Sequence, residues 1–129
     1  MTEEWRDIDG YIGLYQVSNM GNVRRLKGFK SRNDRLLTSQ LNFGGYKKVA
    51  LYKDNKRKVM LVHRLVATAF IENPNNYPEI NHKDEDKTNN VVTNLEWCTH
   101  KYNNNYGTKK ERQIKTMKNT MRIKWGSAE

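Results

Sequence analysis

Residues 80–105 read INHKDEDKTNNVVTNLEWCTHKYNNN, and they point to one compact folding unit. Ile80 and Asn81 are expected to start a short strand. Residues 93–98 (TNLEWC) read as its partner, and a loop rich in Asp, Lys and Asn lies between them. Thr99 is a residue type that caps helix N-termini, so we expect a helix to begin after it. The stretch therefore predicts two strands followed by a helix.

This unit would bring three polar side chains onto one small surface: His82 from the first strand, Asn94 from the loop or the start of the second, and Asn103 from the helix. Hydrolysis of a phosphodiester needs a base that activates water and a cation that stabilises negative charge in the transition state. Histidine accepts protons near neutral pH, and an amide oxygen such as that of Asn94 can hold its ring. Mg²⁺ needs only one or two protein oxygens, because phosphate and water complete its shell. The pattern favours metal-dependent phosphodiester cleavage.

The residues before this unit predict a β-rich region and one helix. Residues 15–23 are expected to form a hairpin, residues 27–45 look irregular, and residues 46–61 are expected to form two further strands. VHRLVATAF (62–70) instead follows a helical period and predicts a short amphipathic helix that packs in the core. Its apolar stripe consists of Val62, Leu65, Val66, Ala69 and Phe70. The predicted fold class is therefore α+β.

The net charge of +10 is distributed unevenly along the chain. Residues 24–58 hold twelve basic and two acidic side chains, and residues 109–129 hold seven basic and two acidic ones. Such basic segments are either solvated faces, coats for an anionic membrane, or binding surfaces for nucleic acid. We favour nucleic acid, because no strongly amphipathic apolar face accompanies the charge in residues 24–58.

Several classes of protein are excluded by size and composition. A chain of 129 residues has room for one domain with arms, which excludes a large multi-lobed enzyme. Cys98 is the only cysteine, so a disulfide framework and a four-cysteine zinc site are both excluded. No apolar run reaches the roughly 18 residues of a membrane span, and the acidic N-terminus is unlike a signal peptide. We therefore expect an intracellular, cytoplasmic protein without a membrane partner.

Residues 80–103 resemble the HNH nuclease motif of the ββα-metal superfamily, with His82, Asn94 and Asn103 in its three named places. The resemblance is to the homing endonucleases encoded by phages and introns. EWRDIDGYIGLYQVSNMGNVRRL is similar to the nuclease-associated modular domain that precedes HNH in those enzymes, and VHRLVATAF is similar to the helix that leads into the motif. Together these segments cover about residues 4–106.

The resemblance implies a role for each residue of the motif. His82 would be the general base, Asn94 would orient it, and Asn103 would bind Mg²⁺ (or Mn²⁺). His100 is an alternative to Asn103 as that ligand. Asn81 stands where some relatives carry a metal-binding aspartate, and it would be a second, weaker ligand. Glu85 stands at the glycine of the usual Asp-Gly-Asn loop, which raises the question of how the loop turns.

Double-stranded DNA is the partner that the basic segments and the resemblance both imply. Phosphate contacts provide affinity and orientation, whereas base edges in a groove provide sequence selection. TKKE (108–111) predicts a capping box at the start of a basic tail helix. The residues expected to contact DNA are Arg24, Arg25, Lys47, Lys48, Lys110, Arg112, Lys115 and Lys118.

The sequence thus predicts three regions: residues 1–58 as a β-rich DNA-binding region, residues 59–106 as the ββα-metal HNH module, and residues 107–129 as a basic helical tail. The expected function is a site-directed, metal-dependent DNA endonuclease of phage or bacterial origin, a monomer that nicks one strand. Two alternatives remain open. One is a DNA-binding protein that keeps the HNH scaffold with weak or no catalysis, and the other is a basic protein that binds RNA or the ribosome.

Overall fold

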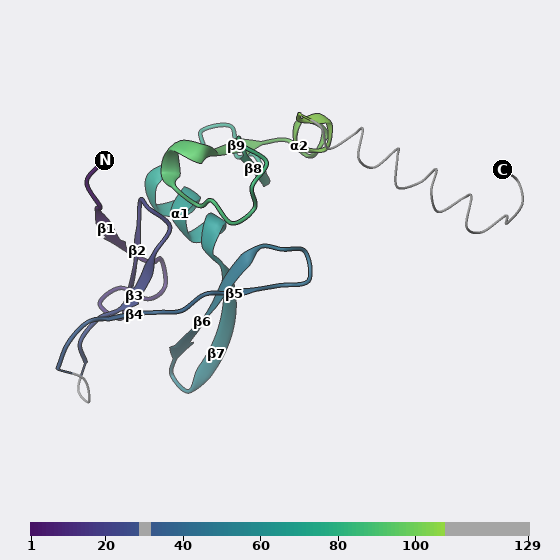
Figure 1. Ribbon diagram of the computed structural model, residues 1–129. Helices are drawn as coiled ribbons and strands as arrows, with labels where there is room; N and C mark the ends of the chain where they lie inside the picture. Colours follow the sequence, from purple (N-terminus) through teal and green to yellow (C-terminus); the bar gives the residue numbers. More distant parts are fainter. Residues whose placement is uncertain (29–31, 108–129) are drawn as a thin grey trace, which may run out of the picture.

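The computed structural model describes residues 1–28 and 32–107, and it has the α+β architecture expected from the sequence (Figure 1). The first seven elements are strands, and the remaining ones alternate between helices and strands. In chain order they are β1 (Trp5–Asp7), β2 (Tyr15–Ser18), β3 (Val23–Arg25), β4 (Arg35–Leu36), β5 (Gln40–Leu41), β6 (Lys47–Lys53), β7 (Lys56–Leu61), α1 (Val62–Phe70), β8 (Glu79–His82), the 3-10 turn η1 (Val92–Asn94), β9 (Leu95–Cys98) and α2 (His100–Asn105).

An antiparallel sheet in the order β1-β2-β3-β4 forms the N-terminal part of the molecule. The predicted hairpin is confirmed as β2 and β3, in which Val17 pairs with Val23. The turn between them passes through Gly21, whose φ of 87° lies in the left-handed region that glycine adopts without steric cost. Val17 and Val23 are both buried, so this hairpin turns one face toward the core.

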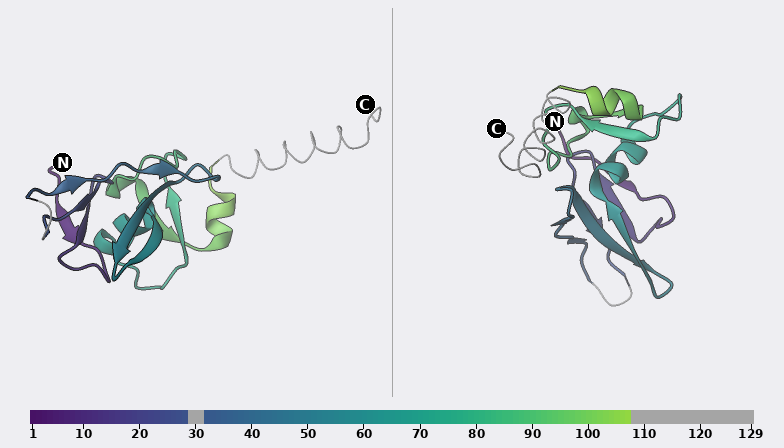
Figure 2. Two further views of the ribbon diagram at one scale, coloured as in Figure 1. Left: turned by 90° about the horizontal axis from the view of Figure 1, so that it is seen from below. Right: turned by 90° about the vertical axis from the view of Figure 1, so that its right-hand side faces the viewer.

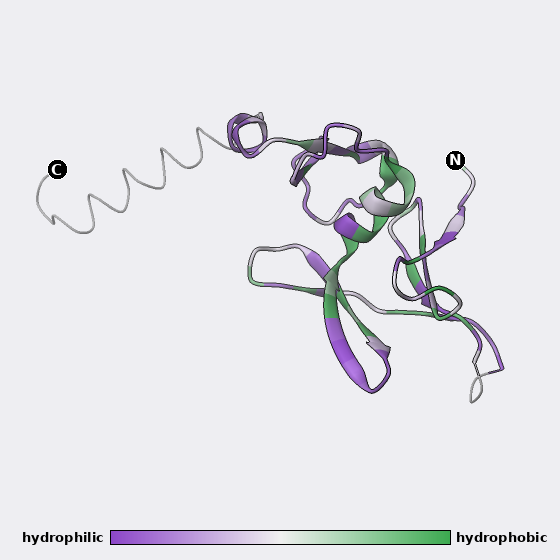
Figure 3. Ribbon diagram, turned by 180° about the vertical axis from the view of Figure 1, so that it is seen from behind, coloured by the Kyte–Doolittle hydropathy of each residue, from purple (hydrophilic) through white to green (hydrophobic). Residues whose placement is uncertain are grey.

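A second antiparallel sheet, in the order β5-β6-β7, follows along the chain. The strands predicted over residues 46–61 are confirmed as β6 and β7. They are joined at Asp54 and Asn55, whose φ values of 53° and 62° are those of a tight hairpin turn. Residues 27–45, which were expected to be irregular, contain two short strands, β4 and β5. Figure 3 shows hydrophilic residues along much of the β6–β7 hairpin.

Helix α1 lies at the centre of the molecule, where it contacts β2, β6, β7, β8 and β9. The left view of Figure 2 shows it between the N-terminal sheet and the β8–β9 pair. The predicted burial of Val62, Leu65 and Val66 is confirmed. The buried stripe differs from the expected one at its edges, because His63 and Ala67 are buried while the end of the helix is only half-buried. One hydrophobic cluster around α1 joins residues of both sheets with Ile80 and Leu95.

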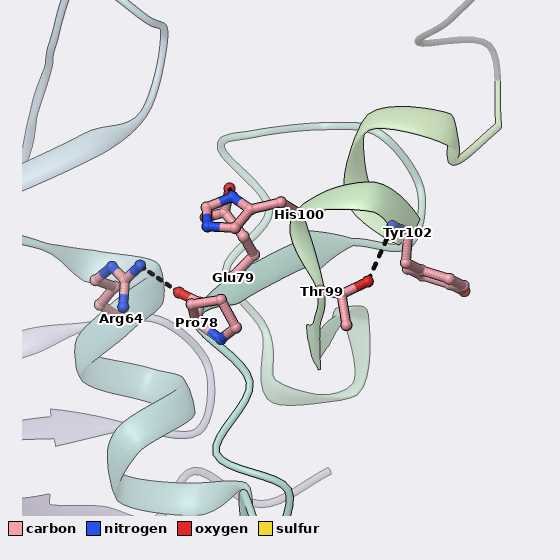
Figure 4. Close-up of polar contacts among 6 residues, drawn as sticks. All are labelled: Arg64, Pro78, Glu79, Thr99, His100 and Tyr102. Atoms are coloured by element: carbon pink, nitrogen blue, oxygen red, sulfur yellow. Dashed lines mark hydrogen bonds and ion pairs between the residues drawn. The ribbon is translucent and has the colours of Figure 1, made fainter.

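The strand–strand–helix unit predicted from residues 80–105 is confirmed as β8, β9 and α2. Strands β8 and β9 are antiparallel, and α2 contacts β8. Thr99 is the N-cap of α2, and its hydroxyl accepts a hydrogen bond from the Tyr102 backbone N–H at 3.1 Å (Figure 4). The chain therefore enters α2 directly from β9, which holds the helix beside the strand that carries His82.

Two predictions concern the limits of these regions. Strand β7 (Lys56–Leu61) runs across the boundary expected between residues 58 and 59 and continues directly into α1. The tail helix expected after Gly107 lies outside the described residues, and so do Lys110, Arg112, Lys115 and Lys118. Within the described part of the chain, no helix has the length and apolar character needed to cross a membrane.

Candidate active site

His82 is the last residue of β8, and its imidazole is held by an amide from the following loop. Only 4% of its surface is exposed, and its Nε2 lies 2.8 Å from Oδ1 of Asn90. Because an amide oxygen only accepts hydrogen bonds, this contact places the ring proton of neutral His82 on Nε2. The basic lone pair then lies on Nδ1. The strand end and the loop together thus set both the position and the tautomer of the ring.

The structure corrects one expected contact, because Asn94 does not hold this ring. Its Oδ1 accepts the Asp84 backbone N–H at 3.0 Å, and its Nδ2 donates to the Asp84 carboxylate and to the Asn89 carbonyl, each at 2.9 Å. Asn94 therefore closes the loop between β8 and η1. Asn90 holds the imidazole. Sequence reasoning missed Asn90, because nothing in a loop with several asparagines shows which amide turns inward.

The loop itself is built by its acidic residues. Asp84 accepts the Asp86 backbone N–H at 2.8 Å, and Asp86 accepts the Thr88 N–H at 2.9 Å, which confirms their interpretation as loop residues. Hydrogen bonds from Asn89 to Asp84 and from Thr88 to Asp86 lower the pKa of both carboxyls. Glu85 has a φ of 63°, so it adopts the left-handed conformation that the family's glycine adopts more easily. Glu85 thus turns the chain in the backbone region that glycine favours.

Two further rings pack against His82, and neither was assigned to the site from the sequence. The ring centroids of His63 and His82 are 5.2 Å apart, and the ring of Tyr46 lies 5.1 Å from His63 and 6.0 Å from His82. A signal for His63 was present, since it has the helical spacing of Val66 and Ala67 on the buried side of α1. An amphipathic stripe that includes a histidine indicates a buried imidazole.

Burial keeps His63 neutral. It is 6% exposed, and desolvation, with smaller contributions from His82 and Arg64, lowers its pKa to about 4. Its Nδ1 is buried and makes no hydrogen bond within the described part of the chain. Burial also raises the pKa of the Tyr46 hydroxyl. His82 is therefore flanked by two rings that stay uncharged at neutral pH.

The opposite face of the β8–β9 pair carries the predicted metal ligands. Asn81 is fully buried, pairs with Glu96 across the strands, and donates from Nδ2 to the Glu96 carboxylate at 3.1 Å. Successive residues of a strand point to opposite faces, so Asn81 points toward α2 while His82 points toward α1. The sequence predicted that these side chains share one surface. In the structure, His82 and Asn81 instead lie on opposite faces of β8, next to each other at its end.

Helix α2 covers this face (Figure 4). His100, the alternative ligand, has its Nδ1 2.8 Å from Oε1 of Glu79 and is largely exposed. Asn103 lies one helical turn further on and shares the His100 side of α2, the side that contacts β8. By this spacing Asn103 is expected on the side of α2 that faces β8, whereas His100 is engaged with Glu79 at the start of that strand.

The donors on this face suit a hard cation. They are amide and carboxylate oxygens from Asn81, Glu96 and Asn103, and no group of three or more His, Cys, Asp or Glu side chains that could hold a metal occurs among the described residues. Zinc sites usually need such a group. Mg²⁺ instead keeps several waters and uses one or two protein oxygens together with phosphate. The oxygen donors present therefore suit a hard divalent cation.

The four described residues expected to bind DNA differ in how they are engaged. Arg25 is exposed on β3, and Lys47 and Lys48 are half-buried on β6. Arg24 is occupied internally: its guanidinium lies 4.2 Å from the centroid of the Trp5 ring and donates to Gln16 Oε1 at 2.7 and 3.0 Å. The exposed hairpin of β6 and β7 adds basic residues that the sequence analysis counted but did not single out, namely Lys56, Arg57 and Lys58.

Comparisons with known proteins match both halves of the chain. Residues 3–52 match the NUMOD4 motif, and residues 60–105 match the HNH endonuclease family. A solved structure that reports DNA binding and cleavage by the HNH homing endonuclease I-HmuI superposes with a TM-score of 0.69 at 39% sequence identity, covering 90% of this chain and 68% of that one.

Similar sequences occur in several viruses. The DNA endonuclease I-HmuI of Bacillus phage SP01 is 45% identical over 100 residues, which is 78% of this chain and 55% of that protein. An uncharacterized HNH endonuclease, L245, of Acanthamoeba polyphaga mimivirus is 44% identical over 104 residues, which is 81% of this chain and 30% of that protein. The H-N-H endonuclease F-TflII of Escherichia phage T5 is 32% identical over 83 residues, covering 63% of this chain and 40% of that one. The chain thus spans about half of the first of these relatives, and less of the other two.

Proposed function

The chain belongs to the HNH endonuclease family, and we propose that it is a metal-dependent, site-directed DNA endonuclease that hydrolyses a phosphodiester. The observation that carries the proposal is the arrangement at the end of β8. There a braced imidazole on one face of the strand adjoins a set of oxygen donors on the other. We propose that it works inside the cell, where DNA is found, as a monomer.

His82 is the proposed general base. With Nε2 bonded to Asn90, its Nδ1 accepts the proton of the attacking water. The neighbouring rings of His63 and Tyr46 keep the imidazole from rotating and exclude bulk water from that side. Asn94 contributes indirectly, because it holds the loop from which Asn90 reaches the ring.

Asn103 and Asn81 are the proposed ligands for Mg²⁺ or Mn²⁺. When bound, the cation stabilises the negative charge that develops on the phosphate and on the leaving oxygen. The hydrogen bond from Asn81 Nδ2 to Glu96 orients the amide, and its oxygen is the atom of this side chain whose chemistry suits a ligand role. An amide oxygen attracts a cation less strongly than a carboxylate does. The site therefore gains affinity when a DNA phosphate supplies further oxygens.

We propose that the basic face of β3, β6 and β7 binds the DNA backbone. Arg25 lies on β3, and Lys47 and Lys48 lie on β6, which contacts α1. Contacts from them to phosphates would orient the duplex without selecting sequence. Arg24 is proposed to support this face from within. The predicted contacts from Lys110, Arg112, Lys115 and Lys118 would extend it along the tail. A single nuclease module per chain would cut one strand per binding event.

A plasmid assay with Mg²⁺ tests the proposal. We expect the protein to convert supercoiled plasmid to the open-circle form, and His82→Ala to lower the rate by about 100-fold or more, because general-base catalysis typically contributes that much. His100→Ala is the matched control, since it removes an exposed histidine of the same module and should keep most of the activity. Asn103→Ala should raise the Mg²⁺ concentration needed for half-maximal rate. Nicking that persists in His82→Ala would refute the assignment of the base.

A second candidate function is DNA binding without cleavage. It is favoured by Asn81, whose neutral side chain stands where a carboxylate would bind the cation more strongly. This candidate predicts tight, salt-sensitive DNA binding and no product with any divalent metal. Restoring activity by Asn81→Asp would show that the scaffold is intact and that the ligand is what limits catalysis.

A further inference from the structure

We propose that Asn90 is the positioning residue of His82, and that the β2–β3 turn of the N-terminal sheet holds Asn90 in place. The N-terminal region would then be part of the catalytic machinery as well as a DNA-binding surface. The inference rests on the proposed function for its catalytic consequence. One of the two contacts that carry it joins Gly21 to Asn90, which lie far apart in the chain, and the other joins Asn90 to His82.

The first contact joins the turn to Asn90. A Cβ built on Gly21 would lie 3.0 Å from Cβ of Asn90, 3.0 Å from its carbonyl oxygen and 3.2 Å from its carbonyl carbon. Such distances mean that the backbone of Gly21 rests directly on Asn90, with no room for a side chain between them. Next to it, the Val92 N–H donates to the carbonyl of Asn19 at 2.8 Å. The turn therefore contacts the loop at Asn90 and at Val92, the two neighbours of Val91.

The turn can hold a position because it is itself rigid. The Ser18 hydroxyl accepts the backbone N–H groups of Met20 and Asn22 at 3.2 and 3.1 Å, and it donates to Glu3 at 2.7 Å. The Asn19 side chain accepts a hydrogen bond from the Glu4 N–H at 2.8 Å and donates one to the Thr2 carbonyl at 3.0 Å. Ser18 and Asn19 are both buried. These bonds tie the turn to the first residues of the chain.

The second contact joins Asn90 to His82. The 2.8 Å bond from His82 Nε2 uses only the oxygen of the Asn90 amide. The Asn90 Nδ2 is buried and has no hydrogen-bond partner in the described part of the chain. A buried donor without a partner is costly, so stability alone does not favour asparagine here. What the side chain does supply is an acceptor directed at the imidazole.

The geometry of the hairpin adds a functional consequence. Arg25 and Arg24 follow the turn on β3, so the strand proposed to face DNA leaves directly from the turn that abuts Asn90. A shift of this hairpin would move the acceptor that sets the tautomer of His82. The hairpin that carries Arg25 would thus also hold the acceptor that positions the base.

Gly21→Ala tests the inference, with Gly13→Ala as its matched control. Both glycines have left-handed φ values, 87° and 79°, so both substitutions carry the same kind of backbone strain. An added Cβ at Gly13 meets nothing within 4 Å, whereas at Gly21 it meets Asn90. Only Gly21→Ala should therefore disturb the site. Asn90→Ala, which removes the acceptor and leaves the turn intact, is the second variant should Gly21→Ala fold poorly.

The ¹⁵N chemical shifts of the His82 ring nitrogens are measured for each variant at one fixed pH. The single-turnover nicking rate at saturating protein and the affinity for the same plasmid are measured as well. We expect Gly21→Ala and Asn90→Ala to change the ring shifts toward a mixture of tautomers. We expect them to lower the nicking rate by about tenfold or more with little change in affinity. Gly13→Ala should match the unmodified protein in both measurements.

The inference is overturned if Gly21→Ala and Asn90→Ala leave the ring shifts as they are in Gly13→Ala. It is also overturned if they weaken DNA binding while the rate at saturation is kept. Should the unmodified protein nick no DNA, the proposed function fails, and the ring shifts alone still decide whether Asn90 and the β2–β3 turn set the tautomer of His82.

Discussion

At the residue scale, the side chains around His82 show how burial sets chemistry. His63 and Asn90 each bury a nitrogen that makes no hydrogen bond within the described residues, and both touch the His82 ring. A core optimised only for stability would avoid such groups, because each costs about 1–3 kcal/mol. Violations of local stability rules are expected at functional sites, so the presence of two such groups beside one imidazole supports the proposed role of His82.

The buried His63 predicts a specific pH dependence of stability. Its pKa is lowered from 6.5 to about 4 in the folded protein, so between these values the unfolded chain binds a proton that the folded chain does not. The free energy of unfolding should therefore fall as the pH falls from about 6.5 to about 4, by up to about 3 kcal/mol. His63→Gln should remove this loss, as measured by urea unfolding at several pH values.

The acidic residues contribute equally to the pH dependence of unfolding in both proteins, so the difference between the proteins reports His63. Glu3, Asp84 and Asp86 have pKa values lowered from 4.5, 3.8 and 3.8, so their contribution is lost as the pH falls below those ordinary values, at and beyond the acid end of this range, and it is the same in both proteins. His100→Gln is the control, because that ring is largely exposed. If the unmodified protein and His63→Gln lose stability in parallel between pH 6.5 and 4, His63 does not stay neutral in the fold.

At the scale of elements, β3 carries two neighbouring arginines that the strand separates by role. Adjacent residues of a strand face opposite ways, so Arg24 stacks on Trp5 and bonds Gln16, while Arg25 is exposed. The two residues have the same chemistry in the sequence. Their difference follows from the order of the sheet, in which β3 pairs with β2 and β2 pairs with β1.

This separation predicts different effects of two matched substitutions. Arg25→Ala should weaken DNA binding and reduce the slope of log affinity against log salt concentration by about one, with the melting temperature unchanged. Arg24→Ala should instead lower the free energy of unfolding by about 1 kcal/mol, because a cation–π contact and its hydrogen bonds are lost. Salt titrations of DNA binding and thermal melts of both variants check this. Equal salt slopes for the two would contradict it.

At the scale of the whole molecule, the predicted DNA-binding region and the nuclease module share one hydrophobic cluster. Tyr15, Val17 and Val23 of the first sheet pack in the same cluster as Val66 of α1 and Leu95 of β9. The chain also passes from β7 into α1 without a linker. Two functional regions are therefore built around a single core, with α1 as the element common to both.

A shared core predicts one cooperative unfolding transition. Val17→Ala removes a fully buried side chain from the first sheet and should lower the free energy of unfolding by about 2 kcal/mol. The loss should shift the unfolding of both regions equally, as reported by Trp5 in β1 and Trp97 in β9, with each tryptophan read in a protein whose other tryptophans are replaced by Phe. Val59→Ala, at an exposed valine, should have little effect. Separate midpoints for the two probes would show independent domains.

The local elements could be predicted because their information is local. The turn at Asp54 and Asn55, the cap at Thr99 and the helical period of residues 62–70 each follow from neighbours in the chain, and the structure confirms all three. The strand–strand–helix unit follows from the same kind of pattern. The identity of the base candidate follows from chemistry, since His82 is a histidine at a strand end followed by a loop rich in asparagine.

The partners of that base could not be predicted, because they depend on which groups a folded loop turns inward. Asn90 and Asn94 are the same residue type in the same loop region. Asn94 is used to hydrogen-bond the backbone of the loop, whereas the side-chain oxygen of Asn90 faces the His82 ring. The contact of Gly21 with Asn90 joins residues whose proximity no local pattern encodes. Short-range propensities thus specify the elements and the candidate base, whereas the packing of distant segments sets the geometry around that candidate.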